Sequence, residues 1–578
     1  MKNLKLIYTF IAIGLFCLSS CNDVLDVEAR DAFAEDLIYN DPEQLERLVY
    51  TVYNSTESWG VNKRQWWGRR FNLEVGSYEA IFNFKLLDQF RLRAGMTPGT
   101  VGMLNGKWDN YWDYVRLANE FLDKVDDSQA MQKDPEKVAV LKAEMRFLRA
   151  NIYSKLIRFY GGVPILENAL GLDDDFALVR NSYEECVDFI VTELDDVSAV
   201  LPETRPGSEF GRATKLAALA VKSRTLLYAA SKLHDPAFAP SNDPLYTYSK
   251  PTKWQDAADA AKAVIDLVGA RDLIAVADAE EYQKLFLSPN EDILFARPYS
   301  ALYYDFGTDA NSLPDQTFSP SGYSGWALAA PTHNFALQFN MADGSTTNDA
   351  SFDPANPNIN REMRYYADLN YNGAEFRGRK VQYYLSDDTG AHPHGLDSEQ
   401  GLGNQQHSSK TGYNIRKFQD ESIGTLNAEG LVDGLTGISP ERPYILYRLA
   451  EIYLNYAEAQ YHLGDEGTAR TFVNKISSRA LQPDITATGA DLLEAIKRER
   501  RIELCFEGHN FFDERRWMNE DHLGFDVKGL RWTKTTDGSE ISEEVTVVER
   551  PWMAQHYYLP IPATEVEKAP TMVQNFGY

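Results

Sequence analysis

Apolar residues recur every three or four positions over two long stretches, 35–290 and 440–520, and this pattern constrains the fold most strongly. One stripe from Met145 to Phe159 stops at Gly161-Gly-Val-Pro164, a sequence typical of a helix end. Between the two stretches, residues 290–440 are rich in Gly, Pro, Asn, Asp, Ser and Tyr. We therefore expect a mainly α protein with a large loop-rich insertion at 290–440 and little β structure.

Residues 444–476 carry a more specific pattern. Ala457, the turn Leu463-Gly464-Asp465, Ala469 and Val473 partly match one tetratricopeptide helix–turn–helix repeat, in which small residues allow close helix contact. Three further segments can form helix pairs that stack beside it: 107–159, 181–232 and 253–288. The scaffold is thus expected to be tetratricopeptide-like. Two other segments look irregular, 54–106 and 520–578, the second with a hairpin signal at Asp537-Gly538.

The N-terminus is typical of an exported lipoprotein. Lys2 and Lys5 precede an apolar run, 6–18, that is too short to span a bilayer, and Leu18-Ser-Ser-Cys21 follows it. Residues 1–20 are therefore predicted to be a signal peptide, with Cys21 as the lipidated residue. The alternative is an ordinary cleaved signal with an incidental cysteine.

Charge and cysteine content narrow the class of protein further. The formal net charge of -27 argues against nucleic acid as a partner. Cys186 and Cys505 lie in helix-like segments without metal-binding spacing, so we expect buried free thiols. A disulfide between them stays open at this point, because pairing cannot be read from sequence.

A densely charged run occupies residues 496–517, Ile-Lys-Arg-Glu-Arg-Arg-Ile-Glu-Leu-Cys-Phe-Glu-Gly-His-Asn-Phe-Phe-Asp-Glu-Arg-Arg-Trp. As an amphipathic helix it would turn Ile496, Ile502 and Phe506 inward and its Glu/Arg pairs outward.

This run also resembles the C-terminal helices of SusD/RagB nutrient-binding lipoproteins from Bacteroidetes outer membranes. Further segments resemble the same family in the same order: 21–26, 143–150, 158–164, 211–215, 325–344, 447–459 and 560–578. The resemblance implies one SusD-like domain over residues 21–578, anchored by lipid to the outer membrane and exposed at the cell surface. It also implies a SusC-like TonB-dependent transporter as partner and a non-catalytic role in capturing oligosaccharides or polysaccharides for import.

A sugar site needs flat aromatic platforms beside polar side chains, and two loop regions supply both. The candidate ligand-binding residues are Trp66, Trp67, Asn72, Tyr78, Tyr303, Tyr304, Asp305 and Trp326. Arg64, Arg69 and Arg70 form a basic cluster that could contact an acidic or sulfated glycan, or the transporter. Trp108 and Trp112, one helical turn apart, are expected in the core.

No nucleophile elbow, zinc-protease, P-loop or dinucleotide motif occurs, so we expect no enzyme activity. His392, His394 and His407 lie in a segment rich in Gly, Asp and Gln, which favours a flexible loop, with metal binding as the alternative. Asp368 to Gly373 begins like a calcium loop, but its twelfth position is Arg379. No cofactor is therefore expected, although calcium stays open. Two other functions remain open as well, namely peptide uptake by the same architecture and a repeat-type protein-interaction module.

Overall fold

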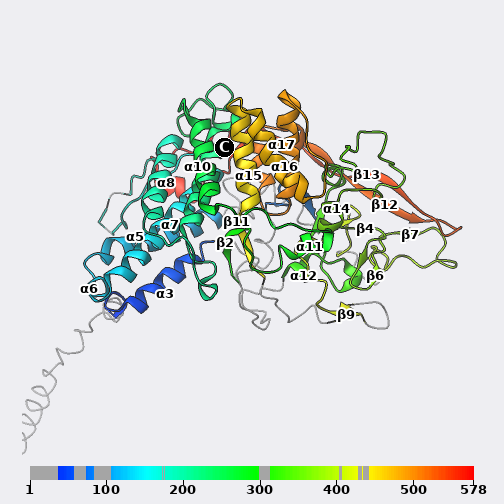
Figure 1. The fold of residues 1–578 in the computed structure, drawn as a ribbon, viewed down its shortest axis with the longest axis horizontal. Helices are drawn as coiled ribbons and strands as arrows, with labels where there is room; N and C mark the ends of the chain where they lie inside the picture. Colours follow the sequence, from blue (N-terminus) through cyan, green and yellow to red (C-terminus); the bar gives the residue numbers. More distant parts are fainter. Residues whose placement is uncertain are drawn as a thin grey trace, which may run out of the picture.

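The computed structural model of the chain describes residues 37–56, 73–83, 106–171, 173–174, 176–298, 313–401, 407–426, 432–433 and 442–578 (Figure 1). The predicted signal peptide and the predicted lipidation site Cys21 lie outside these ranges. Among the described residues, no helix combines the length and the apolar composition needed to cross a bilayer.

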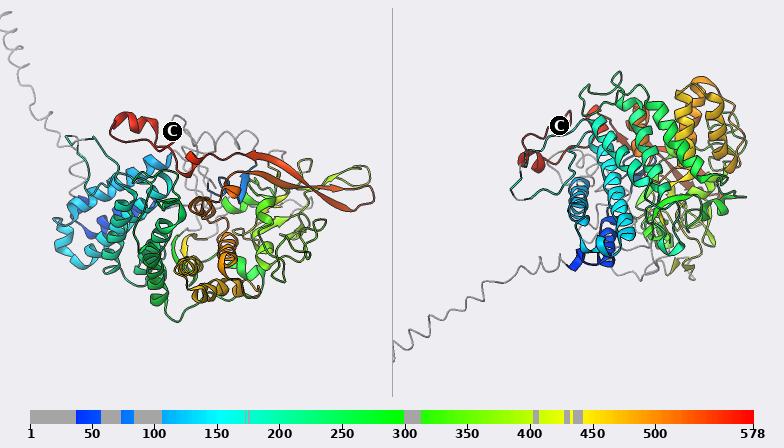
Figure 2. Two further views of the ribbon diagram at one scale, coloured as in Figure 1. Left: turned by 90° about the horizontal axis from the view of Figure 1, so that it is seen from above. Right: turned by 60° about the vertical axis from the view of Figure 1, so that its left-hand side comes forward.

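Helices dominate, as the periodicity predicts. Their bounds are α3 Pro42–Tyr53, α5 Gly106–Val125, α6 Gln129–Lys133, α7 Pro135–Tyr160, α8 Tyr183–Ser198, α9 Lys215–Ala230, α10 Lys253–Val268, α11 Ala279–Lys284, α12 Leu313–Phe318, α13 His333–Ala336, α14 Met363–Asp368, α15 Leu449–His462, α16 Glu466–Arg479, α17 Gly489–Glu503, α18 Asn510–Trp517, α19 Glu520–Leu523 and α20 Ala563–Lys568. The long helices pack in sequence, α5 on α7, α7 on α8, α8 on α9, α9 on α10 and α10 on α15, which then packs on α16 and α17. Figure 2 shows them side by side as stacked pairs. The predicted helical-repeat scaffold is therefore confirmed.

Local capping explains where these helices begin and end. The hydroxyl of Thr214 accepts a hydrogen bond from the Ala217 N–H at the start of α9. Helix α7 ends at Gly161, whose φ of 73° lies in the left-handed region. In the predicted repeat, Gly464 makes the turn with φ 86°, and the Asp465 carboxylate caps α16.

The strands are short except for one hairpin. Their bounds are β1 Ala80–Phe82, β2 Ile293–Arg297, β3 Ala329–Pro331, β4 Leu369–Tyr371, β5 Glu375–Phe376, β6 Arg379–Lys380, β7 Leu385–Ser386, β8 Tyr413–Ile415, β9 Thr425–Leu426, β10 Val432–Asp433, β11 Tyr444–Arg448, β12 Phe525–Lys534 and β13 Glu540–Arg550. Within the described ranges, five antiparallel pairs form, β1–β3, β2–β11, β4–β8, β5–β6 and β9–β10, beside a three-stranded sheet in the order β13-β12-β7. The prediction that residues 520–578 are irregular is therefore wrong for 525–550. Strands β12 and β13 form a long hairpin around Asp537-Gly538 that projects from the loop-rich half (Figures 1 and 2).

Most of the buried hydrophobic residues in the described part of the chain belong to two clusters under these elements. One fills the helical half and includes Trp108, against which the half-buried Trp112 packs. The other lies beneath the short strands of the loop-rich half. Helix α17 contributes to both, with Ile496 in the first cluster and Ile502 in the second. This helix therefore joins the two halves of the molecule.

The predicted orientation of the charged run is only half right. Ile496, Ile502 and Phe506 are buried as expected, but the Glu/Arg pairs are buried too, not exposed. The buried charged residues of the run are Glu499, Arg500, Arg501, Glu503, Asp513, Glu514, Arg515 and Arg516. Apart from Arg515, which donates to the His556 and Phe511 carbonyls, they are buried beside oppositely charged partners from other elements, which periodicity alone cannot reveal.

Glu503 is the centre of this network. Its carboxylate accepts hydrogen bonds from Arg448 at 2.6 Å, from Arg364 at 3.1 Å and from Arg479. Although burial alone would raise the pKa of Glu503, the three guanidinium charges hold it well below its ordinary value. The cations come from β11, α14 and α16, so one carboxylate connects three distant segments to α17.

Two neighbouring clusters continue the network along α18. Asp513 accepts from Arg500 at 2.8 Å and from Arg516 at 2.7 Å, and Arg516 also bonds Glu458 of α15 at 2.6 Å. Glu514 accepts from Arg501 at 2.6 Å. These bonds fix α18 against both α17 and α15.

Both described cysteines are buried free thiols, as predicted, so the open disulfide question is answered by two separate thiols. The thiol of Cys505 lies 3.3 Å from the Asp368 carboxylate, which is fully buried. Burial raises the pKa of Asp368 to about 7, against the lowering effect of Lys417.

We predict that Glu503→Gln lowers the free energy of unfolding by about 3–5 kcal/mol, because three buried guanidinium groups lose their shared negative charge. Urea unfolding measures the change. The matched control is Glu280→Gln, which removes one partner of the exposed Lys284–Glu280 pair and should change stability by less than about 1 kcal/mol. Equal effects of the two substitutions would contradict the central role of Glu503.

Stability should also depend on pH in two opposite ways. The charges of Arg516 and Arg501 outweigh burial and set the pKa of Glu458 and Glu514 to about 2, below an unfolded value of ~4.3. Their stabilisation is therefore complete above that unfolded value and is lost as the pH falls toward 2, by on the order of 3 kcal/mol for each group. Asp368 has the opposite effect because its pKa is raised on folding. Its contribution to stability is complete below pH ~3.9, the unfolded pKa, and is lost as the pH rises through about 7.

Accordingly, Glu514→Gln should flatten the acid limb of a stability–pH profile, and Asp368→Asn should flatten the decline between pH ~4 and ~7. Unfolding by urea at several pH values measures both limbs. Profiles of the two variants that run parallel to the wild-type profile would contradict this assignment.

Candidate functional site

The segments that follow the two predicted aromatic loop regions pair with each other as β1 and β3. Strand β1 follows the first region and β3 follows the second, and their register pairs Ala80 with Pro331 and Phe82 with Ala329. The backbone of Tyr78 also lies against the second region, because the Thr332 hydroxyl donates to the Tyr78 carbonyl at 2.9 Å. Segments about 250 residues apart in sequence are thereby held side by side.

A constrained turn presents Trp326 beside this junction. Ser324 and Ala327 have positive φ angles of 60° and 44°, a conformation that non-glycine residues rarely adopt. The Trp326 N–H donates to the Gln316 carbonyl at 2.7 Å, and the Leu328 N–H donates to the Thr317 carbonyl at 2.8 Å. Trp326 is half-buried against the core of the loop-rich half. Its backbone is thus fixed while part of the residue stays accessible to solvent.

Asn83 reinforces the turn and was not predicted from sequence. Its backbone N–H donates to the Leu328 carbonyl at 3.1 Å, and its side-chain amide donates to the Ala327 carbonyl. The same side chain accepts from the Lys410 N–H at 3.1 Å. A single buried asparagine in an irregular stretch carries no periodic signal, so only the three-dimensional contacts reveal it.

Tyr78, a predicted ligand residue, is packed inside the protein. Its ring stacks on His522 with centroids 3.8 Å apart and tilts against Phe525 at 4.8 Å. Only 8% of the residue is exposed, and burial raises its pKa to about 12. Because its ring is covered, we leave Tyr78 out of the site proposed below.

The other predicted contacts lie outside the described residues. These are Trp66, Trp67, Asn72, Tyr303, Tyr304, Asp305 and the basic cluster Arg64, Arg69 and Arg70. For them the sequence-based prediction stands without structural detail.

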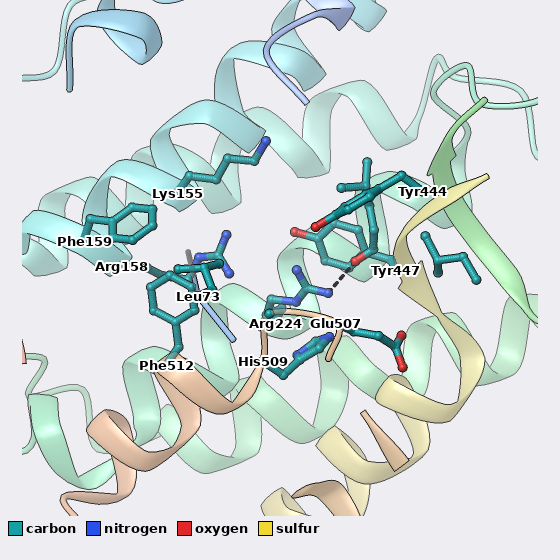
Figure 3. A pocket seen from close by; sticks show the side chains of 13 residues that line it. Leu73, Lys155, Arg158, Phe159, Arg224, Tyr444, Tyr447, Glu507, His509 and Phe512 are labelled. Atoms are coloured by element: carbon teal, nitrogen blue, oxygen red, sulfur yellow. Dashed lines mark hydrogen bonds between the residues drawn. The ribbon is translucent and has the colours of Figure 1, made fainter. Parts of the chain in front are cut away.

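A second feature is a narrow cavity with mixed aromatic, aliphatic and charged lining between α7, α9, β11 and the turn that precedes α18 (Figure 3). Basic side chains line it, namely Lys155, Arg158 and Arg224, together with Glu507 and His509. This cavity was not predicted, because in the sequence Arg158 is simply part of the last turn of an amphipathic helix.

No metal centre emerges in the part of the chain that the structure describes, where no group of three or more His, Cys, Asp or Glu side chains is arranged to hold an ion. The ring of His394 accepts a hydrogen bond from the Ser386 N–H at 2.9 Å. Asp368, the first position of the calcium-like sequence, faces Cys505 and not a loop.

Comparisons with known proteins agree with this architecture. Residues 291–578 match the family model described as the SusD family, and residues 44–227 match one described as "Starch-binding associating with outer membrane". SusD-like protein P25 of Formosa agariphila is 22% identical over 99% of each chain. Starch-binding protein SusD of Bacteroides thetaiotaomicron is 24% identical, over 81% of this chain and 78% of that protein.

Solved structures show the same likeness. A SusD-like protein from Bacteroides fragilis is 26% identical with a TM-score of 0.75, covering 95% of this chain and 99% of that one. A SusD-like carbohydrate binding protein from the same species shares the fold, with 24% identity, a TM-score of 0.72 and coverage of 92% and 99%. Stacked helix pairs that carry a loop-rich half define a helical-repeat scaffold protein. Within this class, the chain belongs to the SusD/RagB family.

We predict that Gly325→Ala lowers the free energy of unfolding by about 1–3 kcal/mol, because the added Cβ would lie 2.0 Å from the Ser319 carbonyl oxygen. Thermal or urea unfolding measures the loss. Gly207→Ala is the control, since its added Cβ meets no atom within 4 Å. If both variants were as stable as the wild type, the turn would not be constrained as described.

Proposed function

We propose that this protein is a non-catalytic binding lipoprotein that captures oligosaccharides or polysaccharides at the cell surface. It hands them to a partner SusC-like TonB-dependent transporter in the outer membrane for import. In this proposal residues 21–578 act as a single domain, which the contribution of α17 to both hydrophobic clusters supports.

Family relationships support the ligand class and the location. One relative is named for starch binding, and one solved relative is named as carbohydrate binding. The family model matched by residues 44–227 is described as associating with the outer membrane. The lipobox-like sequence that ends at Cys21 supports a lipid anchor there.

The observation that carries the proposal is Trp326 on its fixed turn beside the β1–β3 pair, which joins the segments that follow the two predicted aromatic loop regions. Sugar rings bind through their C–H faces on flat aromatic side chains and through hydroxyl groups on nearby polar groups. Trp326 is a half-buried aromatic residue on a fixed turn at this junction. A preformed platform of this kind suits capture, because little ordering free energy is lost on binding.

Calorimetric titration of residues 22–578 against neutral, acidic and sulfated oligosaccharides and a peptide mixture tests the proposal. Binding of one sugar class without turnover supports the proposal. Because the proposed site contains no metal ion, EDTA should leave the heat of sugar binding unchanged. If only the peptide mixture gave heat of binding, the glycan proposal would be wrong and peptide uptake would take its place. Turnover of a bound oligosaccharide would contradict the non-catalytic assignment.

We predict that Trp326→Ala weakens glycan binding about three- to tenfold, the effect of losing one aromatic stacking surface. Phe238→Ala is the matched control, because Phe238 is an exposed aromatic residue, 55% accessible, on a separate loop. Titration with the glycan that binds wild-type protein measures both variants, and thermal unfolding checks that each is folded. An unchanged affinity in Trp326→Ala would remove Trp326 from the site.

A further inference from the structure

The narrow cavity of Figure 3 has an unusual charge for so acidic a protein. Its acidic lining residue, Glu507, is already engaged, because it accepts from Arg448 at 2.7 Å and from Lys417 at 3.0 Å. Arg224 is likewise engaged by both carboxylate oxygens of Glu451, each at 2.6 Å. The charge of the cavity therefore depends on its remaining basic groups.

Arg158 is the cation that faces the cavity without a carboxylate partner among the described residues. Its Nε donates to the Ser154 carbonyl at 3.2 Å, and its guanidinium lies 4.7 Å from the centre of the Phe512 ring. Its terminal nitrogens point into the cavity (Figure 3). These nitrogens are available for a bidentate contact with an oxyanion.

His509 is a second unsatisfied group in the same cavity. The residue is only 7% exposed, its ring faces the cavity, and neither ring nitrogen has a hydrogen-bond partner in the described part of the chain. Burial and the charges of Arg224, Arg500, Arg448 and Arg158 hold its pKa well below the ordinary value, so the ring is neutral with one N–H donor. A buried donor of this kind normally has an acceptor.

The backbone supplies a third set of donors. Gly508 and His509 line the cavity and directly precede α18. The N–H groups of His509 and Asn510 have no acceptor among the described residues. The first N–H groups of a helix carry a partial positive charge and commonly bind anions.

Size restricts what these donors can bind. The free volume of the cavity is about 30 Å³, whereas one water molecule needs roughly 10–15 Å³ in the same measure. A sugar ring is therefore excluded, and a compact charged group is admitted. Lys155, which donates to the Ser55 carbonyl at 3.2 Å, adds positive charge at the edge of the cavity.

We propose that this cavity is a binding site for a compact oxyanion of the sulfate or carboxylate class, held by Arg158, His509 and the N-terminal end of α18. The anion is either free or carried on a sugar whose ring stays outside the cavity. The inference does not rest on the proposed glycan function, because a free ion can occupy the site by itself.

Equilibrium dialysis with radiolabelled inorganic sulfate, at constant ionic strength, is the first test. One ion should bind per chain, and Arg158→Gln and His509→Gln should each weaken binding at least about tenfold. Arg116→Gln is the matched control, since it removes a cation that is 69% exposed on α5, and it should leave binding unchanged. Arg158→Lys keeps the charge and should retain part of the affinity if Arg158→Gln proves unstable.

A second arm separates the two sources of the anion. A sulfated disaccharide and its desulfated counterpart are titrated against the wild type and Arg158→Gln. Binding of the sulfated sugar alone, lost in Arg158→Gln, with no binding of inorganic sulfate, supports an anion carried on the ligand. The proposal is overturned if neither inorganic sulfate nor the sulfated sugar shows binding that depends on Arg158 or His509, whatever neutral glycans do.

Discussion

The buried Glu503 carboxylate is the interaction on which the rest of the structure depends. At the end of α17, it forms ion pairs with Arg448 of β11, Arg479 of α16 and Arg364 of α14. Removing these charges from water is costly, so the cluster is weak evidence for stability in itself. Its consequence is geometric, because one carboxylate at the end of α17 connects this helix to β11, α14 and α16.

The network also positions both candidate sites. After Glu503 the chain turns through Phe506, which has φ 60° and whose N–H donates to the buried Glu79 carboxylate at 3.0 Å. A few residues later the Asn510 side chain accepts from the Tyr78 N–H at 3.2 Å. These two bonds hold the start of β1 against the segment that follows α17. Strand β1 in turn pairs with β3, which follows the turn that carries Trp326. The same turn before α18 forms one wall of the basic cavity.

Much of the fold was predictable, because helices and their caps depend on local sequence. The stripe that ends at Gly161 and the Gly464 turn both appear where the periodicity placed them. The burial of the charged run was not predictable, since an exposed helix face and a buried ionic network have the same Glu/Arg spacing. For the site, loop composition suggested candidate residues, most of which lie outside the described residues. The covered ring of Tyr78 and the cavity around His509 depend on contacts between distant segments, which the sequence does not show.

The most direct test of the account is a crystal structure of residues 22–578 with the oligosaccharide that binds most tightly. The account predicts a sugar ring stacked on Trp326 beside the β1–β3 junction, on a turn with the backbone described above. A ligand bound at a distant surface, with the Trp326 ring untouched, would contradict the claim that the turn held beside the β1–β3 pair forms the sugar site.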